Sequence, residues 1–145
     1  MNLSEHFTLA EFVQSDIAVR KGLDNTPDAD TLEVLKVTAA GLEEVRELLG
    51  KPIHVNSGYR SLKVNSAVGG SGTSQHCKGE AVDFIAPQYG TPQEVCRAIL
   101  DSTIEFDQLI YEGAWVHISF TDKPRHSVMT AHFGNGKTTY TQGVA

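Results

Sequence analysis

Apolar residues recur at spacings of three and four between residues 28 and 49, which is typical of an amphipathic helix with one buried face. Gly50 and Pro52 follow the last apolar position and predict where this helix ends. The charged residues fall between the apolar ones and predict a solvated outer face. The apolar positions are Leu32, Leu35, Ala39, Leu42, Val45 and Leu49. We therefore expect this helix to form the centre of the core.

Capping residues predict two more helices. Thr8 can cap a short helix, and Glu11 three residues later completes a capping box. Residues 15–16 break its pattern and predict an early end. The segment 91–102 opens with a threonine, a proline and a glutamate in the same capping order, which predicts a second helix with a well-defined start.

Short strands dominate the second half of the chain. Glycines connect them at Gly113-Ala114 and at Gly134-Asn135-Gly136, which predicts two hairpins. Residues 62–74 predict a long loop. The predicted strands are 53–57, 81–86, 106–112, 115–120, 128–133 and 138–140. Without a regular alternation of strands and helices, we expect one α+β domain over residues 1–145, with an antiparallel sheet packed against helices.

Composition excludes several classes of protein. The 145 residues are 40% hydrophobic and 21% charged, as in a soluble globular domain. The net charge is −6 and no basic run occurs, which argues against nucleic acid as a partner. No apolar run reaches the roughly 20 residues of a membrane span. The first seven residues resemble no secretory signal, so we expect synthesis in the cytoplasm, with Cys77 and Cys96 as reduced thiols.

Three residues suggest a metal site. His76 follows a Gly/Ser-rich segment, and Asp83 interrupts the apolar strand that comes next. A half-buried carboxylate requires a cation or several hydrogen-bond donors. His117 lies on a later predicted strand, on the face away from Val116 and Ile118. Two histidines and a carboxylate form a known open zinc set, which leaves a fourth position for water.

Three segments in this order resemble the zinc D-alanyl-D-alanine peptidases, and more narrowly their D-Ala-D-Ala carboxypeptidases and the related phage murein peptidases. They are 57–61 (Ser-Gly-Tyr-Arg-Ser), 74–83 (Ser-Gln-His to Asp) and 115–119 (Trp-Val-His-Ile-Ser). The similarity extends from about Phe7 to Phe133. It implies a hedgehog/DD-peptidase-like fold with one Zn²⁺ held by the two histidines and the aspartate named above.

The resemblance also implies a role for Arg60, which should face the cleft and bind or polarise the carboxylate or the scissile carbonyl of the substrate. A guanidinium suits this role because its donors match a carboxylate. Ser57 and Gln75 are expected to contact the substrate or to support the ligands. Trp115 is expected to form a cleft wall, with plain packing in the sheet as the alternative.

The general base is less evident. Members of the family commonly place an acidic residue three positions before the last histidine ligand, where this chain has Ala114. Glu112 is the nearest carboxylate, and we take it as the candidate base. The alternatives are an exposed hairpin glutamate and a site with weak or lost activity. Asp107 should point to the opposite face from Glu112 and is a poorer candidate.

The sequence therefore predicts a zinc peptidase that hydrolyses a peptide bond in the stem peptides of bacterial peptidoglycan, as a carboxypeptidase or an endopeptidase. The alternative is a metal-stabilised module of the same fold that binds the cell wall or forms part of a virion. Since the wall lies outside the cytoplasm, the resemblance implies action after release from the cell or as part of a phage particle.

Overall fold

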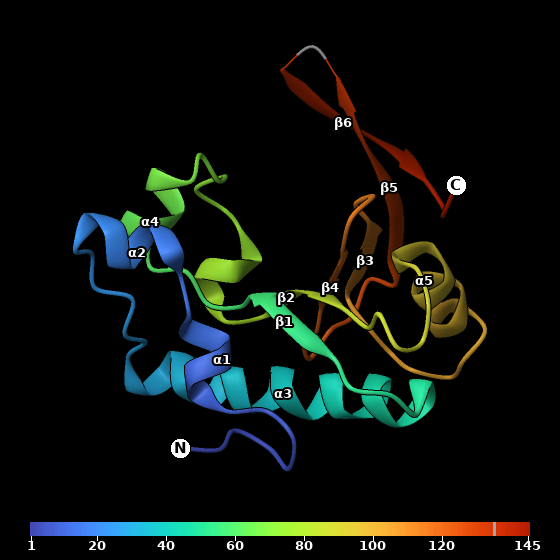
Figure 1. Cartoon of the computed structure of the whole chain (residues 1–145), viewed down its shortest axis with the longest axis horizontal. Helices are drawn as coiled ribbons and strands as arrows, with labels where there is room; N and C mark the ends of the chain where they lie inside the picture. Colours follow the sequence, from blue (N-terminus) through green and yellow to red (C-terminus); the bar gives the residue numbers. More distant parts are fainter. Residues whose placement is uncertain (135) are drawn as a thin grey trace.

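The computed structural model describes residues 1–134 and 136–145, and within them it contains five α-helices, one 3-10 helix and one six-stranded sheet (Figure 1). The helices are α1 (Leu9–Val13), α2 (Asp16–Lys21), α3 (Ala29–Leu49), α4 (Leu62–Ala67), η1 (Gln75–Lys78, the 3-10 helix) and α5 (Pro92–Leu100). The strands are β1 (His54–Ser57), β2 (Ala81–Ile85), β3 (Gln108–Tyr111), β4 (Val116–Ser119), β5 (Ser127–Gly134) and β6 (Lys137–Gln142). The predicted α+β class is confirmed.

The sheet has the strand order β1-β2-β4-β3-β5-β6. Both predicted hairpins are present, as β3–β4 and β5–β6, although Asn135 of the second turn lies outside the described residues. The expectation of an antiparallel sheet is wrong at one pair, because β3 and β5 run parallel. The end of β4 and the start of β5 both lie beside Gln108, so the segment 120–126 only has to pass around the end of β3.

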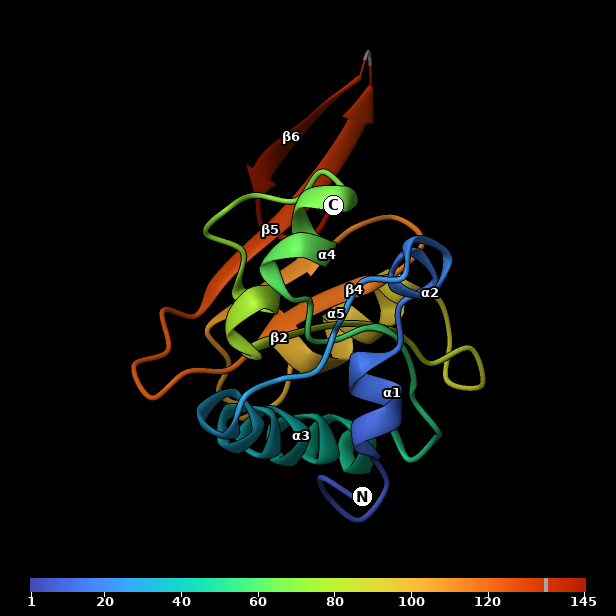
Figure 2. The same cartoon turned by 90° about the vertical axis from the view of Figure 1, so that its left-hand side faces the viewer.

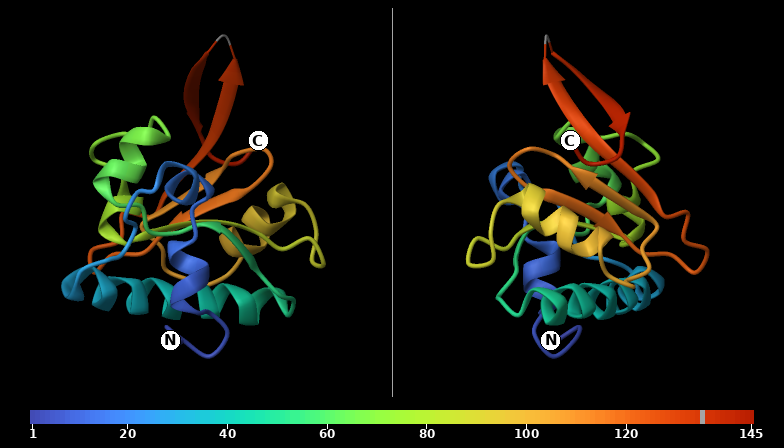
Figure 3. Two further views of the ribbon diagram at one scale, coloured as in Figure 1. Left: turned by 60° about the vertical axis from the view of Figure 1, so that its left-hand side comes forward. Right: turned by 90° about the vertical axis from the view of Figure 1, so that its right-hand side faces the viewer.

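The long helix α3 packs with α1 and α5 against one face of the sheet (Figures 1 and 3). Strand alternation decides which residues reach this core: Val82 and Phe84 of β2 and Ile118 of β4 are fully buried in it. The same alternation turns Asp83 and His117 to the opposite face. That face carries the polar site.

Two short helices differ from the prediction. The residues expected to end the first helix begin α2 instead, because the Ser15 side chain accepts a hydrogen bond from the backbone N–H of Ala18. The predicted loop 62–74 begins with α4, which Ser61 caps in the same way through Val64 N–H. Figure 2 shows α2 and α4 close together, beside the sheet. Both helices start at serines, where a capping signal competes with a turn signal.

The β5–β6 hairpin projects from the body of the molecule, and we call residues 127–142 the arm (Figures 1, 2 and 3). All six residues of β6 are exposed. The arm points away from the side of the molecule on which α3 and the N-terminus lie. It is therefore held mainly by its pairing with β3.

Two other expectations concern single features. Throughout the described ranges, 1–134 and 136–145, no helix is long and apolar enough to cross a membrane. Cys77 and Cys96 are both free, as expected. Cys96 is buried on α5, and burial raises the pKa of its thiol to about 12. It packs as a small hydrophobic residue.

Candidate metal centre

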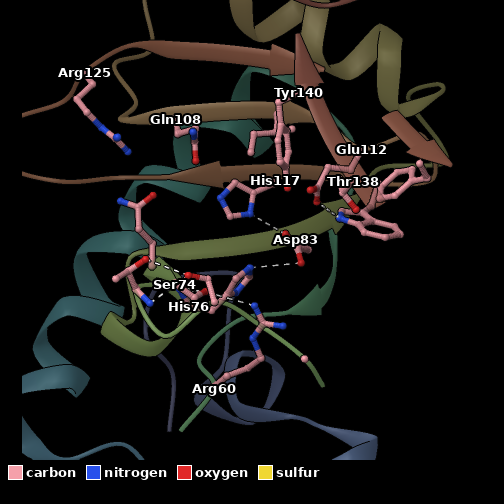
Figure 4. Close-up of a pocket in the computed structure, with 17 residues that line it drawn as sticks. Arg60, Ser74, His76, Asp83, Gln108, Glu112, His117, Arg125, Thr138 and Tyr140 are labelled. Carbon is pink, nitrogen blue, oxygen red and sulfur yellow. Dashed lines mark hydrogen bonds and ion pairs between the residues drawn. The ribbon is translucent and has the colours of Figure 1, made fainter. Parts of the chain in front are cut away.

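His76, Asp83 and His117 come together on the polar face of the sheet (Figure 4). Asp83 of β2 and His117 of β4 lie directly opposite one another in the strand register, and His76 comes from η1. One ligand atom from each residue lies within 4.8 Å of the other two. The predicted ligand group is therefore assembled, by a pairing of strands 34 residues apart in sequence.

Local capping positions His76. His76 lies in the 3-10 turn η1, directly after the predicted loop 62–74, and the Ser74 side chain accepts a hydrogen bond from the backbone N–H of His76 at 3.2 Å. Gly79 ends this turn with a φ of +77°, a conformation that favours glycine. Its carbonyl accepts a buried hydrogen bond of 2.6 Å from Thr38 Oγ1 of α3. The turn is thus anchored to the core helix.

A backbone carbonyl sets the tautomer of His76. Its Nδ1 lies 2.7 Å from the carbonyl oxygen of Gly58, and because a carbonyl only accepts, Nδ1 must carry the proton. In the neutral ring, the lone pair of Nε2 then points toward Asp83 Oδ2, 3.4 Å away. Two acceptors facing one another need a cation between them. The donor set therefore fits a metal ion.

The third ligand completes the same arrangement. His117 Nδ1 lies 2.9 Å from Asp83 Oδ1. Burial alone would raise the pKa of the Asp83 carboxyl. When the His117 and His76 rings are protonated, their hydrogen bonds and positive charge outweigh burial and hold that pKa well below its usual range. Asp83 is thus an anion at neutral pH, as a metal ligand must be.

Glu112 lines the same pocket, directly after β3. Burial and the negative charge of Asp83 raise the pKa of its carboxyl, although His117 and a hydrogen bond from Trp115 Nε1 partly oppose the shift. A raised pKa suits a group that accepts a proton and returns it near neutral pH. Ala114, at the position where an acid was expected, is exposed on the turn and does not line the pocket.

Arg60 lies on the other side of the ligand group from Tyr140 (Figure 4). Its backbone N–H donates to the His76 carbonyl at 3.1 Å, and its Nη2 donates to Ser74 Oγ at 3.4 Å. Its Nε is buried, and no group within residues 1–134 and 136–145 accepts a hydrogen bond from it. Arg60 lines the pocket, so the donors of its guanidinium can bind an anionic or carbonyl oxygen of a ligand.

The other predicted site residues occupy different places. Gln75 and Trp115 line the pocket, and Gln75 donates to Asp107 at 2.9 Å. Ser57 pairs with Asp83 in the β1–β2 register and is not among the residues that line the pocket. Their roles toward a substrate stay predictions.

The pocket has a volume of about 580 Å³, and sequence reasoning missed part of its lining. Phe133, Thr138 and Tyr140 contribute to it from the arm. The Phe133 ring lies 6.3 Å from the Trp115 ring, centroid to centroid, and Tyr140 faces the ligand group (Figure 4). The hairpin itself was predicted, but no local signal states which way a hairpin projects.

Comparison with known proteins agrees with this geometry. The model of a family described as Peptidase M15 matches residues 5–119. A curated relative, the zinc D-Ala-D-Ala carboxypeptidase of Streptomyces albus G, is 40% identical over 88 residues, which are 59% of this chain and 33% of the relative. The chain thus aligns with about a third of the length of that relative. The matched range contains His76, Asp83 and His117, and from its extent we conclude that the chain belongs to the Peptidase M15 family.

Proposed function

We propose that this chain is a zinc-dependent peptidase that hydrolyses a peptide bond in the stem peptides of bacterial peptidoglycan, as a D-Ala-D-Ala carboxypeptidase or as a murein endopeptidase. The observation that carries the proposal is the joint position of the His76, Asp83 and His117 ligand atoms and the Glu112 carboxylate in one pocket. Family membership and the name of the relative from Streptomyces albus G support zinc as the metal and D-Ala-D-Ala peptides as the substrate class.

His76 Nε2, an Asp83 oxygen and His117 Nδ1 would hold the zinc ion. When bound, zinc lowers the pKa of a water molecule toward neutrality and polarises a carbonyl oxygen. Glu112, with its raised pKa, takes the proton of the attacking water and returns it to the nitrogen of the leaving amine. Trp115 Nε1 orients the Glu112 carboxylate by donating a hydrogen bond to it.

Arg60 binds the substrate rather than moving a proton. Its guanidinium lines the pocket and donates to a carboxylate or carbonyl oxygen of the peptide. The guanidinium is prepositioned by the Ser74 hydroxyl, so binding costs little additional ordering. The open cleft exposes Trp115 and the arm to the remainder of the stem peptide.

Purified protein with one equivalent of zinc tests the proposal on muropeptides, with products identified by mass spectrometry. Release of free D-alanine indicates a carboxypeptidase, and cleavage of cross-linked dimers indicates an endopeptidase. Glu112→Gln should lower kcat by a factor of about 10² to 10⁴, the usual contribution of general acid–base catalysis, and retain zinc. Glu105→Gln is the matched control, since Glu105 is exposed and lies outside this pocket.

A second candidate function is a binding module for the cell wall or for a virion, which the absence of an acid at Ala114 favours. The same experiment separates the two functions. Zinc-loaded wild-type protein that binds murein but cleaves no muropeptide, with Glu112→Gln indistinguishable from it, would establish the module and reject the peptidase. Action after release from the cell, or within a phage particle, stays a prediction from the substrate class.

A further inference from the structure

Asp107 has an unusual environment for a carboxylate that takes no part in the proposed chemistry. Only 2% of the residue is exposed. Oδ1 accepts hydrogen bonds from the backbone N–H of Arg125 at 3.0 Å and from its Nε at 2.9 Å. Oδ2 accepts from Arg125 Nη2 at 2.7 Å, Gln75 Nε2 at 2.9 Å and Ser119 Oγ at 3.3 Å. These five donors saturate the carboxylate, which accordingly has no lone pair left for a reacting proton.

Asp107 was expected on the opposite face from Glu112. Asp107 itself does not line the pocket, but its carboxylate contacts Gln75 and Arg125, which do. Asp107 directly precedes β3, so strand alternation does not dictate the direction of its side chain. Its backbone is fixed from both sides: its N–H donates to the carbonyl of Ser119 at 2.8 Å, and its carbonyl accepts from Ser127 N–H at 2.9 Å. The carboxylate therefore starts from a rigid position.

Two of the donors belong to the segments that carry metal ligands. Gln75 directly precedes His76 in η1, and Ser119 follows His117 by two residues on β4. The carboxylate thus joins the 3-10 turn to β4, next to the pocket that Gln75 and Arg125 line. Arg125 supplies the positive charge that a buried carboxylate needs, and it lies beyond the residues 5–119 that match the family.

We propose that Asp107 is a positioning residue: by holding Gln75 and Ser119, it keeps the His76 turn and the His117 strand at the separation that a metal ion requires. The inference rests on the metal centre of the proposed function. Substitution of outer groups that orient metal ligands typically lowers metal affinity about 10- to 100-fold. Asp107→Asn keeps the size of the side chain but turns an amide N–H₂ toward donors, which should displace Gln75.

The experiment measures the zinc dissociation constant by competition with a chelator, together with the absorption spectrum of the Co²⁺-substituted protein. Asp107→Asn should weaken zinc binding about 10- to 100-fold and shift the Co²⁺ bands. Ser119→Ala, which removes a single donor, should weaken it by a smaller factor in the same direction. This second variant keeps the test decisive if Asp107→Asn folds poorly.

Glu43→Gln is the matched control. Glu43 also accepts several hydrogen bonds, from Ser4 Oγ at 2.6 Å and from the backbone and Nδ1 of His6 at 2.6 and 2.7 Å, but it lies outside the pocket. Glu43→Gln should lower the thermal unfolding temperature and leave zinc affinity and the Co²⁺ spectrum unchanged. If Asp107→Asn and Ser119→Ala both bind zinc within twofold of wild type, the positioning role is rejected. Wild-type protein that binds no zinc would instead reject the metal centre itself.

Discussion

We call the metal-ligand group, together with Asp107 and the residues that donate to it, the floor of the site. The floor differs from the arm in burial, in hydrogen bonding and in whether the family match covers it. On the floor, His76 and Asp107 are 4% and 2% exposed and their polar atoms have protein partners. On the arm, Phe133 and Tyr140 are 59% and 49% exposed and rest on a two-stranded extension. The floor lies within the residues that match the family, except for Arg125, and the arm lies outside them.

This difference teaches how the two parts should respond to change. A saturated polar floor tolerates few substitutions, because each one leaves a buried group without a partner. A substitution at an exposed residue of the arm removes mainly the contacts that this residue makes with a ligand. We therefore expect floor variants to alter metal binding and stability, and arm variants to alter substrate affinity alone.

The largest expected effect follows from Asp83→Ala on the floor. Removing the carboxylate between two histidines eliminates one of three metal ligands, so bound zinc should fall from one per chain to near zero and hydrolysis to background. Zinc content by mass spectrometry and muropeptide turnover measure both. Asp122→Ala, an exposed aspartate outside the ligand group, should change neither. Full zinc content in Asp83→Ala would contradict the ligand assignment.

Arg60 should show the next largest effect. Arg60→Ala removes a charge-assisted hydrogen bond, worth about 1.5–3 kcal/mol, which corresponds to about a 10- to 150-fold loss in kcat/KM. Arg60→Lys should recover only part of this loss, because an ammonium lacks the second donor edge of a guanidinium. Zinc content should stay at the wild-type level. Equal kcat/KM for wild type and Arg60→Ala would remove Arg60 from the substrate site.

Acid should lower the free energy of unfolding by protonating Asp107. The hydrogen bonds from Arg125 are the main reason why the pKa of the Asp107 carboxyl lies well below its ordinary value of 3.8. Its stabilising contribution, about 1.5–3 kcal/mol for a charge-assisted pair, is therefore complete above pH 3.8 and is lost as the pH falls below that value. Chemical unfolding of the zinc-free protein measures this: the difference between wild type and Asp107→Asn should be constant from pH 7 to 5 and shrink toward pH 2. A difference independent of pH would contradict it.

The smallest effect is expected on the arm. Phe133→Ala should lower kcat/KM on muropeptides by about three- to tenfold, since a half-exposed ring has part of its apolar surface left to bury, worth about 1 kcal/mol. Zinc affinity and the unfolding temperature should not change. Tyr89→Ala, an exposed aromatic outside the pocket, is the control. An unfolding temperature that drops by several degrees in Phe133→Ala would show that the arm is not an independent wall.

Sequence reasoning succeeded where local chemistry decides the structure. The capping boxes at Thr8–Glu11 and Thr91–Glu94 are both formed, and α3 spans Ala29–Leu49 as its pattern predicted. The metal-ligand candidates Asp83 and His117 were found because each is a polar residue within an apolar strand, and His76 because it follows a Gly/Ser-rich segment. Phe7 and Phe12, on either side of the first capping box, pack with ring centroids 5.9 Å apart, as in a hydrophobic staple.

The parts that sequence reasoning missed depend on contacts between distant segments. The parallel pairing of β3 and β5, the position of the arm over the pocket and the contact of the Asp107 side chain with Gln75 are all of this kind. A serine can start a helix or a turn, so α2 and α4 were also missed. Local patterns carry no information about these choices.

Gly58 has a practical consequence for protein engineering. A Cβ at this position would lie 2.5 Å from the carbonyl oxygen of Phe12 in α1, while the Gly58 carbonyl itself fixes the tautomer of His76. The first helix therefore presses directly on the backbone that orients a metal ligand, although it lies far from the cleft in sequence. Libraries aimed at new substrates can vary the exposed residues of the arm, whereas trimming or redesigning the N-terminal helix would change the position of the ligand His76.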